Sequence, residues 1–157
     1  MSHGHRTTAA SSSGIRYFYL VTVFFLTLTG FGQMPIFKRY YIADLPGLGW
    51  LAEFFVTHYI HYLGAILFLA LAFYILLDFV VLKRRSRKLT KSGWIRCTLL
   101  GVILVSGVFL IIRNLSGSNL SATFIILLDL SHLGSVMAFL LLGLYCLIFR
   151  KKWTTLN

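Results

Sequence analysis

Four long apolar runs restrict what this chain can fold into more than any other feature of its sequence. They extend from Ile15 to Met34, from Trp50 to Leu82, from Ile95 to Ile112 and from Ser121 to Phe149. About 20 apolar residues in a helix cross the ~30 Å hydrocarbon core of a bilayer. Helices also satisfy their own backbone polar groups, which lipid cannot do. The sequence therefore predicts an all-α membrane protein, a bundle of four transmembrane helices.

Composition points to the same class and excludes a water-soluble globule. The chain is 58% hydrophobic and 12% charged, with a mean hydropathy of +0.83. Such a chain has too little polar surface to cover a globule in water. Residues 1–14, rich in Ser, Thr and Ala, predict a disordered cytoplasmic tail. The transmembrane domain is then expected at residues 15–150, with a second cytoplasmic tail at 151–157.

The basic residues predict the orientation of the spans. The net charge is +11, and the cations lie mostly between the apolar runs, so they indicate membrane orientation and anionic lipid rather than nucleic acid. With both termini in the cytoplasm, twelve of the fifteen Lys and Arg residues fall on the inner side. These twelve are Arg6, Arg16, the seven basic residues between Lys83 and Arg96, and Arg150, Lys151 and Lys152. The sequence thus predicts a multi-pass protein of an inner (cytoplasmic) membrane with both ends inside.

The second and fourth runs share a pattern that begins with a histidine. An alignment without gaps on His61 and His132 matches several further positions. The matched pairs are Phe68 with Phe139, Leu69 with Leu140, Leu71 with Leu142 and Tyr74 with Tyr145. In the predicted topology each matched run is the returning helix of a hairpin. The sequence therefore predicts two parallel helical-hairpin repeats, with both histidines at one depth on the outer side.

The matched histidines predict a shared ligand. A histidine inside a membrane span is rare and costly, so it marks a candidate functional site. Bundles build cofactor sites from side chains on facing helices, and two imidazoles suit one haem b. His61 and His132 are therefore predicted to be metal ligands. The alternative is that both are packed polar residues bonded to the backbone.

Other residues of the outer half could complete a haem site. Gly30 and Gly107, on the first and third spans, are predicted to leave room for the porphyrin. Lys38, Arg39 and Arg113 are the basic residues of the outer side and would meet the propionates. The alternative for the glycines is plain helix packing.

Three further residues are candidates for proton handling on the outer side. His58 lies one helical turn before His61 and could replace it as a ligand, exchange a quinol proton, or simply sit at the membrane interface. Glu53 and Asp129 could each accept a proton or orient a histidine. For both carboxylates the alternative is an ion pair with an outer cation.

With histidines on the second and fourth spans and cations outside, the chain resembles the membrane cytochrome b subunits of respiratory complexes. The comparison is with the gamma subunits of formate dehydrogenases and their relatives in hydrogenases and thiosulfate reductases. The resemblance implies electron transfer between an extracytoplasmic redox partner and membrane quinone. The formate dehydrogenase type has two haems and uses further histidines on the first span and late in the fourth. This chain lacks both, so one haem is expected.

No catalytic motif of soluble enzymes occurs in the sequence. An electron-transfer subunit is therefore expected rather than a complete enzyme. The alternative from another class is a cofactor-free membrane anchor or assembly subunit of a larger complex, whose histidines are structural. A small transporter fits less well, because the spans lack the Gly/Pro interruptions that build midplane substrate sites.

Overall fold

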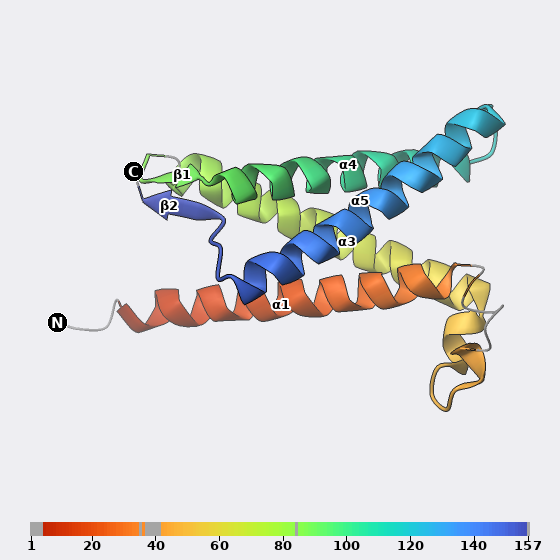
Figure 1. Cartoon of the computed structure of the whole chain (residues 1–157), viewed down its shortest axis with the longest axis horizontal. Helices are drawn as coiled ribbons and strands as arrows, with labels where there is room; N and C mark the ends of the chain where they lie inside the picture. Colours follow the sequence, from red (N-terminus) through yellow and green to blue (C-terminus); the bar gives the residue numbers. More distant parts are fainter. Residues whose placement is uncertain (1–4, 35, 37–41, 84, 157) are drawn as a thin grey trace. The chain divides into compact units, whose positions relative to one another are not determined.

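The protein is almost entirely helical (Figure 1). The structure, a computed structural model, describes residues 5–34, 36, 42–83 and 85–156. The long helices are α1 (His5–Gly32), α3 (Phe54–Asp78), α4 (Lys91–Arg113) and α5 (Ala122–Ile148). The short elements are two 3₁₀ turns, η1 (Ile42–Asp44) and η2 (Gly49–Ala52), one π turn, η3 (Phe79–Lys83), and two strands, β1 (Arg87–Leu89) and β2 (Thr154–Leu156).

Four helical segments are long and apolar enough to cross a membrane. They are Gly14–Gly32, Phe54–Lys83, Lys91–Arg113 and Ala122–Ile148. Only 11% of the most apolar window of each is buried inside the protein, so most of these side chains face outward. Apolar surface of this extent is unfavourable in water and is satisfied by lipid. The predicted all-α membrane fold with four spans is confirmed.

The ends of the last two spans are set by hydroxyl caps. Thr90 precedes α4, and its Oγ1 accepts a hydrogen bond from the Gly93 amide at 2.9 Å. Ser121 precedes α5, and its Oγ accepts from the Phe124 amide at 3.3 Å. Such caps satisfy amides that have no partner within the helix. The fourth span therefore begins where the sequence predicts, directly after Ser121.

The second span begins later than predicted. The expected start at Trp50 is wrong, because Gly49–Ala52 forms a 3₁₀ turn and Glu53 is extended, with φ −76° and ψ 98°. The Glu53 carbonyl then accepts hydrogen bonds from the Thr57 amide at 3.0 Å and the Thr57 hydroxyl at 3.1 Å. These bonds start a new helix at Phe54. The apolar sequence pattern therefore continues across an interruption of the helix at Glu53.

The first helix begins earlier than the apolar run. α1 starts at His5 and so extends into the stretch for which the sequence predicts a disordered tail. No proline interrupts residues 5–14. Extending an existing helix fixes one residue for each hydrogen bond gained, whereas starting one is costly. The helix of the apolar span can therefore continue into residues 5–14, although these are polar and have only moderate helix propensity.

The chain divides into two compact units, each of which is described by itself: unit 1 (Met1–Asp78) and unit 2 (Phe79–Asn157). In unit 1, α1 packs antiparallel against α3 (Figure 1). Small residues allow the close approach. A Cβ added to Gly64 would lie 3.1 Å from Leu26 Cδ2, and one added to Gly32 would lie 3.1 Å from the carbonyl of Leu51. Leu51, on η2, is only 1% exposed and covers this end of the hairpin.

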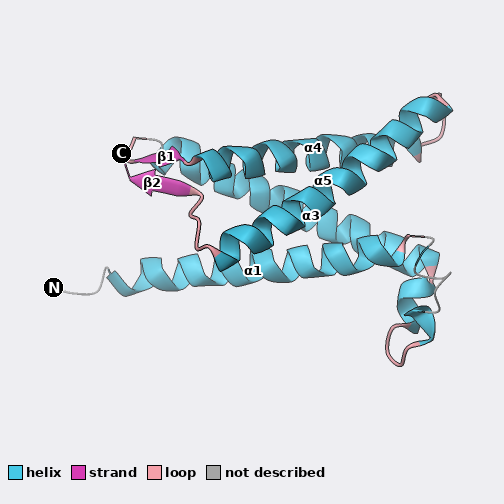
Figure 2. Ribbon diagram, viewed as in Figure 1, coloured by secondary structure: helices cyan, strands magenta, loops and turns pink. Residues whose placement is uncertain are grey.

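In unit 2, α4 packs against α5, and the two strands form a small antiparallel sheet, shown in magenta in Figure 2. Arg87 pairs with Leu156, and Leu89 pairs with Thr154. The sequence analysis did not predict this sheet, because each strand has only three residues. It joins the basic loop after the second span to the C-terminal segment. These two segments are therefore neighbours in unit 2.

Several further contacts hold the C-terminal segment against the start of α4. The Thr90 amide donates to the Trp153 carbonyl at 3.0 Å, and the Thr90 hydroxyl donates to the Lys152 carbonyl at 2.9 Å. Arg96 is 5% exposed; its Nη2 donates to the Lys151 carbonyl at 3.1 Å, and its guanidinium lies 4.7 Å from the Trp153 ring centroid. Gly93 has no room for a Cβ, which would collide with the Trp153 carbonyl.

Candidate functional site

In unit 1 the candidate site is the contact of His61 with α1. His61 Nδ1 lies 3.0 Å from the hydroxyl oxygen of Thr29, whose side chain is fully buried. The next residue, Gly30, faces the same ring. A Cβ added there would lie 3.4 Å from His61 Cε1, which is tighter than most real Cβ contacts. A hydroxyl residue followed by glycine thus lets the imidazole pack directly against the backbone of α1.

Unit 2 contains the same local arrangement. His132 Nδ1 lies 3.0 Å from Ser106 Oγ on α4, and Ser106 is 4% exposed. A Cβ added to Gly107 would lie 3.3 Å from His132 Cε1. Both histidines are half-buried. The two contacts match atom for atom, although each lies within its own hairpin.

The hydroxyl groups determine which ring nitrogen carries the proton. A hydroxyl has one proton to donate. Thr29 Oγ1 lies 2.7 Å from the Phe25 carbonyl, and Ser106 Oγ lies 2.6 Å from the Val102 carbonyl. A carbonyl can only accept, so each hydroxyl proton is directed to the backbone. Each hydroxyl oxygen therefore accepts the Nδ1–H of its histidine.

This hydrogen bond leaves each neutral imidazole with its lone pair on Nε2. Histidines that bind metals usually donate the other ring N–H to a neighbouring group, which fixes the tautomer and the ring orientation. The environment of His61 and His132 therefore fits that of a metal ligand. The glycines serve the contact itself, since they accommodate the imidazole rings. The expectation that they also leave room for a porphyrin stays a prediction.

His58 has a separate environment in unit 1. Its Nδ1 lies 3.1 Å from Gln33 Oε1, just beyond the end of α1. The ring stacks on Phe54 with a centroid distance of 5.1 Å and lies 4.3 Å from the Tyr62 ring centroid. Nε2 of Gln33 is buried and has no hydrogen-bond partner among the described residues. The His58–Gln33 pair is therefore a second polar cluster, distinct from the contact of His61 with Thr29.

The carboxylates and cations predicted for the outer side are placed only in part. Arg113 Nη1 donates to both carboxylate oxygens of Asp129, at 3.1 and 3.0 Å, so the ion-pair alternative holds for Asp129. Glu53 is exposed at the break before α3, and no ion pair with a described residue involves it. Lys38 and Arg39 lie outside the described residues.

Among residues 5–34, 36, 42–83 and 85–156, no group of three or more His, Cys, Asp or Glu side chains could hold a metal ion. A haem does not require such a group, because the porphyrin supplies most of the ligands and the protein supplies only the axial ones. His61 and His132 are each a candidate axial ligand within their own hairpin.

Sequence analysis missed Thr29, Ser106 and Gln33. A signal was available for the first two, since each is a hydroxyl residue directly before the glycine already singled out in its span. Gln33 is one of few polar residues near the end of the first span, but nothing in the sequence pairs it with His58.

Comparison with known protein families, with characterised proteins and with solved structures found no match for this chain.

The contact of Thr29 with His61 predicts an unequal effect of two similar substitutions. Thr29→Val removes the acceptor of a buried Nδ1–H and should lower the free energy of unfolding by about 1–3 kcal/mol. Thr22→Val is the matched control, because Thr22 is also buried in α1 but its hydroxyl bonds, among the described residues, just the Phe18 carbonyl, at 2.8 Å. Equilibrium unfolding in mixed micelles measures both. Equal losses for the two variants would contradict the hydrogen bond.

Proposed function

We propose that this chain is a b-type cytochrome subunit that relays electrons between an extracytoplasmic redox partner and the membrane quinone pool. One haem b would be held by His61 from unit 1 and His132 from unit 2. We also propose that the chain is related to the four-helix membrane cytochrome b subunits that its sequence resembles. The chain would act as one subunit of a respiratory oxidoreductase.

The observation that carries this proposal is the matched pair of histidine contacts. Each imidazole donates Nδ1–H to a buried hydroxyl and lies against a glycine, and this arrangement is present in both hairpins. Structural histidines need a partner but do not need the same partner twice. A common requirement for an oriented Nε2 lone pair explains the coincidence.

The roles of the protein residues follow from this arrangement. When bound, the haem supplies reversible one-electron chemistry at its iron. Thr29 and Ser106 would hold each imidazole in its ligating tautomer and orientation. Gly30 and Gly107 would keep each ring close to the backbone of the neighbouring helix. Lys38, Arg39 and Arg113 are the cations proposed for the outer edge.

Quinone exchange is proposed beside the His58–Gln33 pair, on the outer side. Quinone carbonyls accept hydrogen bonds, and the buried Gln33 Nε2 is a donor that lacks a partner among the described residues. His58, 3.1 Å from the same amide, is a titratable group that could exchange the quinol proton. Asp129 is a weaker candidate for this role than the sequence suggested, because its carboxylate is paired with Arg113.

The haem assignment predicts a spectroscopic result. The purified protein should show a reduced-minus-oxidised spectrum of low-spin, bis-histidine haem b. His61→Ala and His132→Ala should each abolish the signal, because each removes one axial ligand. His58→Ala is the control and should retain most of it. A full spectrum in either ligand variant, or no haem in the wild-type protein, would favour the cofactor-free membrane anchor instead.

The quinone proposal predicts a kinetic effect without loss of cofactor. His58→Ala should slow haem reduction by a quinol analogue in proteoliposomes by about two orders of magnitude, the usual size of a general acid–base contribution. Gln33→Leu should also slow it, because it removes a hydrogen-bond donor to the quinone. The haem spectrum should be unchanged. In the Asp129→Asn variant, which changes the carboxylate paired with Arg113, the haem should be reduced at the wild-type rate. Unchanged rates in both His58 and Gln33 variants would place quinone exchange elsewhere.

The proposed location is the inner membrane with both termini in the cytoplasm, and it predicts a labelling pattern. A cysteine introduced in the 114–119 loop should react with a membrane-impermeant thiol reagent added outside intact cells. One introduced at Ser86 should react only after the cells are opened. Cys97 and Cys146 are first replaced by Ser so that only the introduced thiol is detected. The opposite pattern would reverse the orientation and move the histidines to the cytoplasmic side.

A further inference from the structure

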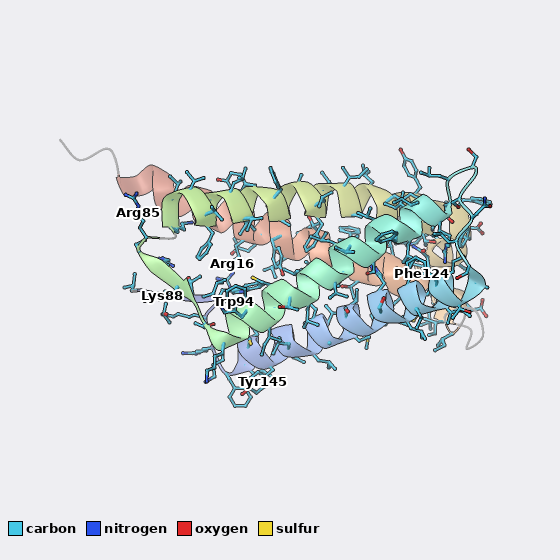
Figure 3. The ribbon with its side chains drawn as sticks, turned by 90° about the horizontal axis from the view of Figure 1, so that it is seen from above. Arg16, Arg85, Lys88, Trp94, Phe124 and Tyr145 are labelled. Carbon is cyan, nitrogen blue, oxygen red and sulfur yellow. The ribbon has the colours of Figure 1, made fainter. Side chains whose placement is uncertain are left out.

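Unit 2 contains a groove at the end of the hairpin where the two strands lie. The groove has a volume of about 370 Å³ and is lined by Phe79, Arg87, Lys88, Leu89 and Trp94. Figure 3 shows Lys88 and Trp94 at this end, opposite the end that carries Phe124. The groove plays no part in the proposed electron transfer.

The position of the groove places it at the membrane surface. Phe79 lies in the last turns of the second span, which ends at Lys83, and Trp94 lies in the first turn of the third span, which begins at Lys91. Tryptophan is enriched at the level of the lipid headgroups, and Trp94 is 63% exposed. The groove is therefore open where headgroups meet acyl chains.

The lining combines the two chemistries of an anionic phospholipid. Phe79, Leu89 and Trp94 supply an apolar wall, and Arg87 and Lys88 supply two cations. Neither cation is ion-paired with a carboxylate of the described residues. Asp78, the acidic residue nearest in sequence, is not among the lining residues.

The cations are held in place by the fold. Both belong to β1, where Arg87 pairs with Leu156 and Lys88 with Thr155 of the C-terminal strand. Arg87 Nη1 also donates to Thr154 Oγ1 at 3.4 Å. A site ordered before binding loses less conformational entropy when its ligand arrives.

We propose that this groove binds one anionic phospholipid, with its phosphate at Arg87 and Lys88 and its upper acyl chains against Phe79 and Trp94. A lipid, rather than free phosphate, is the occupant, because three of the five lining residues are apolar and the groove lies where two membrane spans end and begin. The bound lipid would stabilise the small sheet, because it contacts β1 directly.

Native mass spectrometry of the full-length protein in detergent tests this assignment with phosphatidylglycerol and phosphatidylcholine as probes. The wild-type protein should retain one phosphatidylglycerol more tightly than phosphatidylcholine. The double variant Arg87→Gln/Lys88→Gln should lose about twenty- to thirtyfold in affinity for phosphatidylglycerol, since each basic residue near a membrane surface contributes about a factor of five. Its affinity for phosphatidylcholine should be unchanged.

The matched control is Lys151→Gln/Lys152→Gln, which removes the same charge at the same end of unit 2 but outside the groove. This control should keep the wild-type preference, and an equal loss would show non-specific attraction and overturn the proposal. Trp94→Ala, which keeps both cations, should weaken lipid binding but not binding of inorganic phosphate. Displacement of the lipid by millimolar inorganic phosphate would assign the site to phosphate and also overturn it.

Discussion

Lipid offers no partner to a polar group, and most of this structure can be understood from that constraint. Every hydroxyl and imidazole placed in a span must find its donor or acceptor inside the protein. The buried hydroxyls do so locally: Thr22, Thr29 and Ser106 each bond the carbonyl four residues earlier. Two of them also face a histidine of the neighbouring helix. The imidazoles are thus satisfied within each hairpin, and this requirement brings the two helices together at a defined register.

Small residues make that register possible. Gly30 and Gly107 face the two histidine rings, and Gly64 faces Leu26. At these three positions the absence of a side chain lets the paired helices approach closely. In membranes such close packing replaces the hydrophobic effect as the source of association between helices. The glycines, hydroxyls and histidines of each hairpin therefore form one packing unit. A metal or other group that binds Nε2 would therefore meet an imidazole ring whose orientation is already fixed by this packing.

The two ends of unit 2 are held by different interactions. At one end Arg113 and Asp129 form an ion pair between α4 and α5. At the other, the paired strands and the contacts of Thr90 and Arg96 with the C-terminal segment close the hairpin. Arg96 shows how a charge is tolerated in this setting, since its guanidinium is bonded to a carbonyl and lies on the Trp153 ring. The backbone of Arg87 and Lys88 is consequently fixed by strand pairing, and the proposed lipid site depends on this.

The sequence by itself determined the fold class, because runs of some twenty apolar residues have few alternatives to a transmembrane helix. It also determined the candidate histidines and the adjacent glycines, because polar or very small residues stand out in an apolar run. The break at Glu53, the pairing of β1 with β2 and the partners of the histidines could not be read from it. These depend on contacts between residues far apart in the chain, such as Thr29 with His61 at 3.0 Å and Ser106 with His132 at 3.0 Å. Only the tertiary structure decided which ring nitrogen of each imidazole carries the proton, because the hydrogen-bonding hydroxyl lies on another helix.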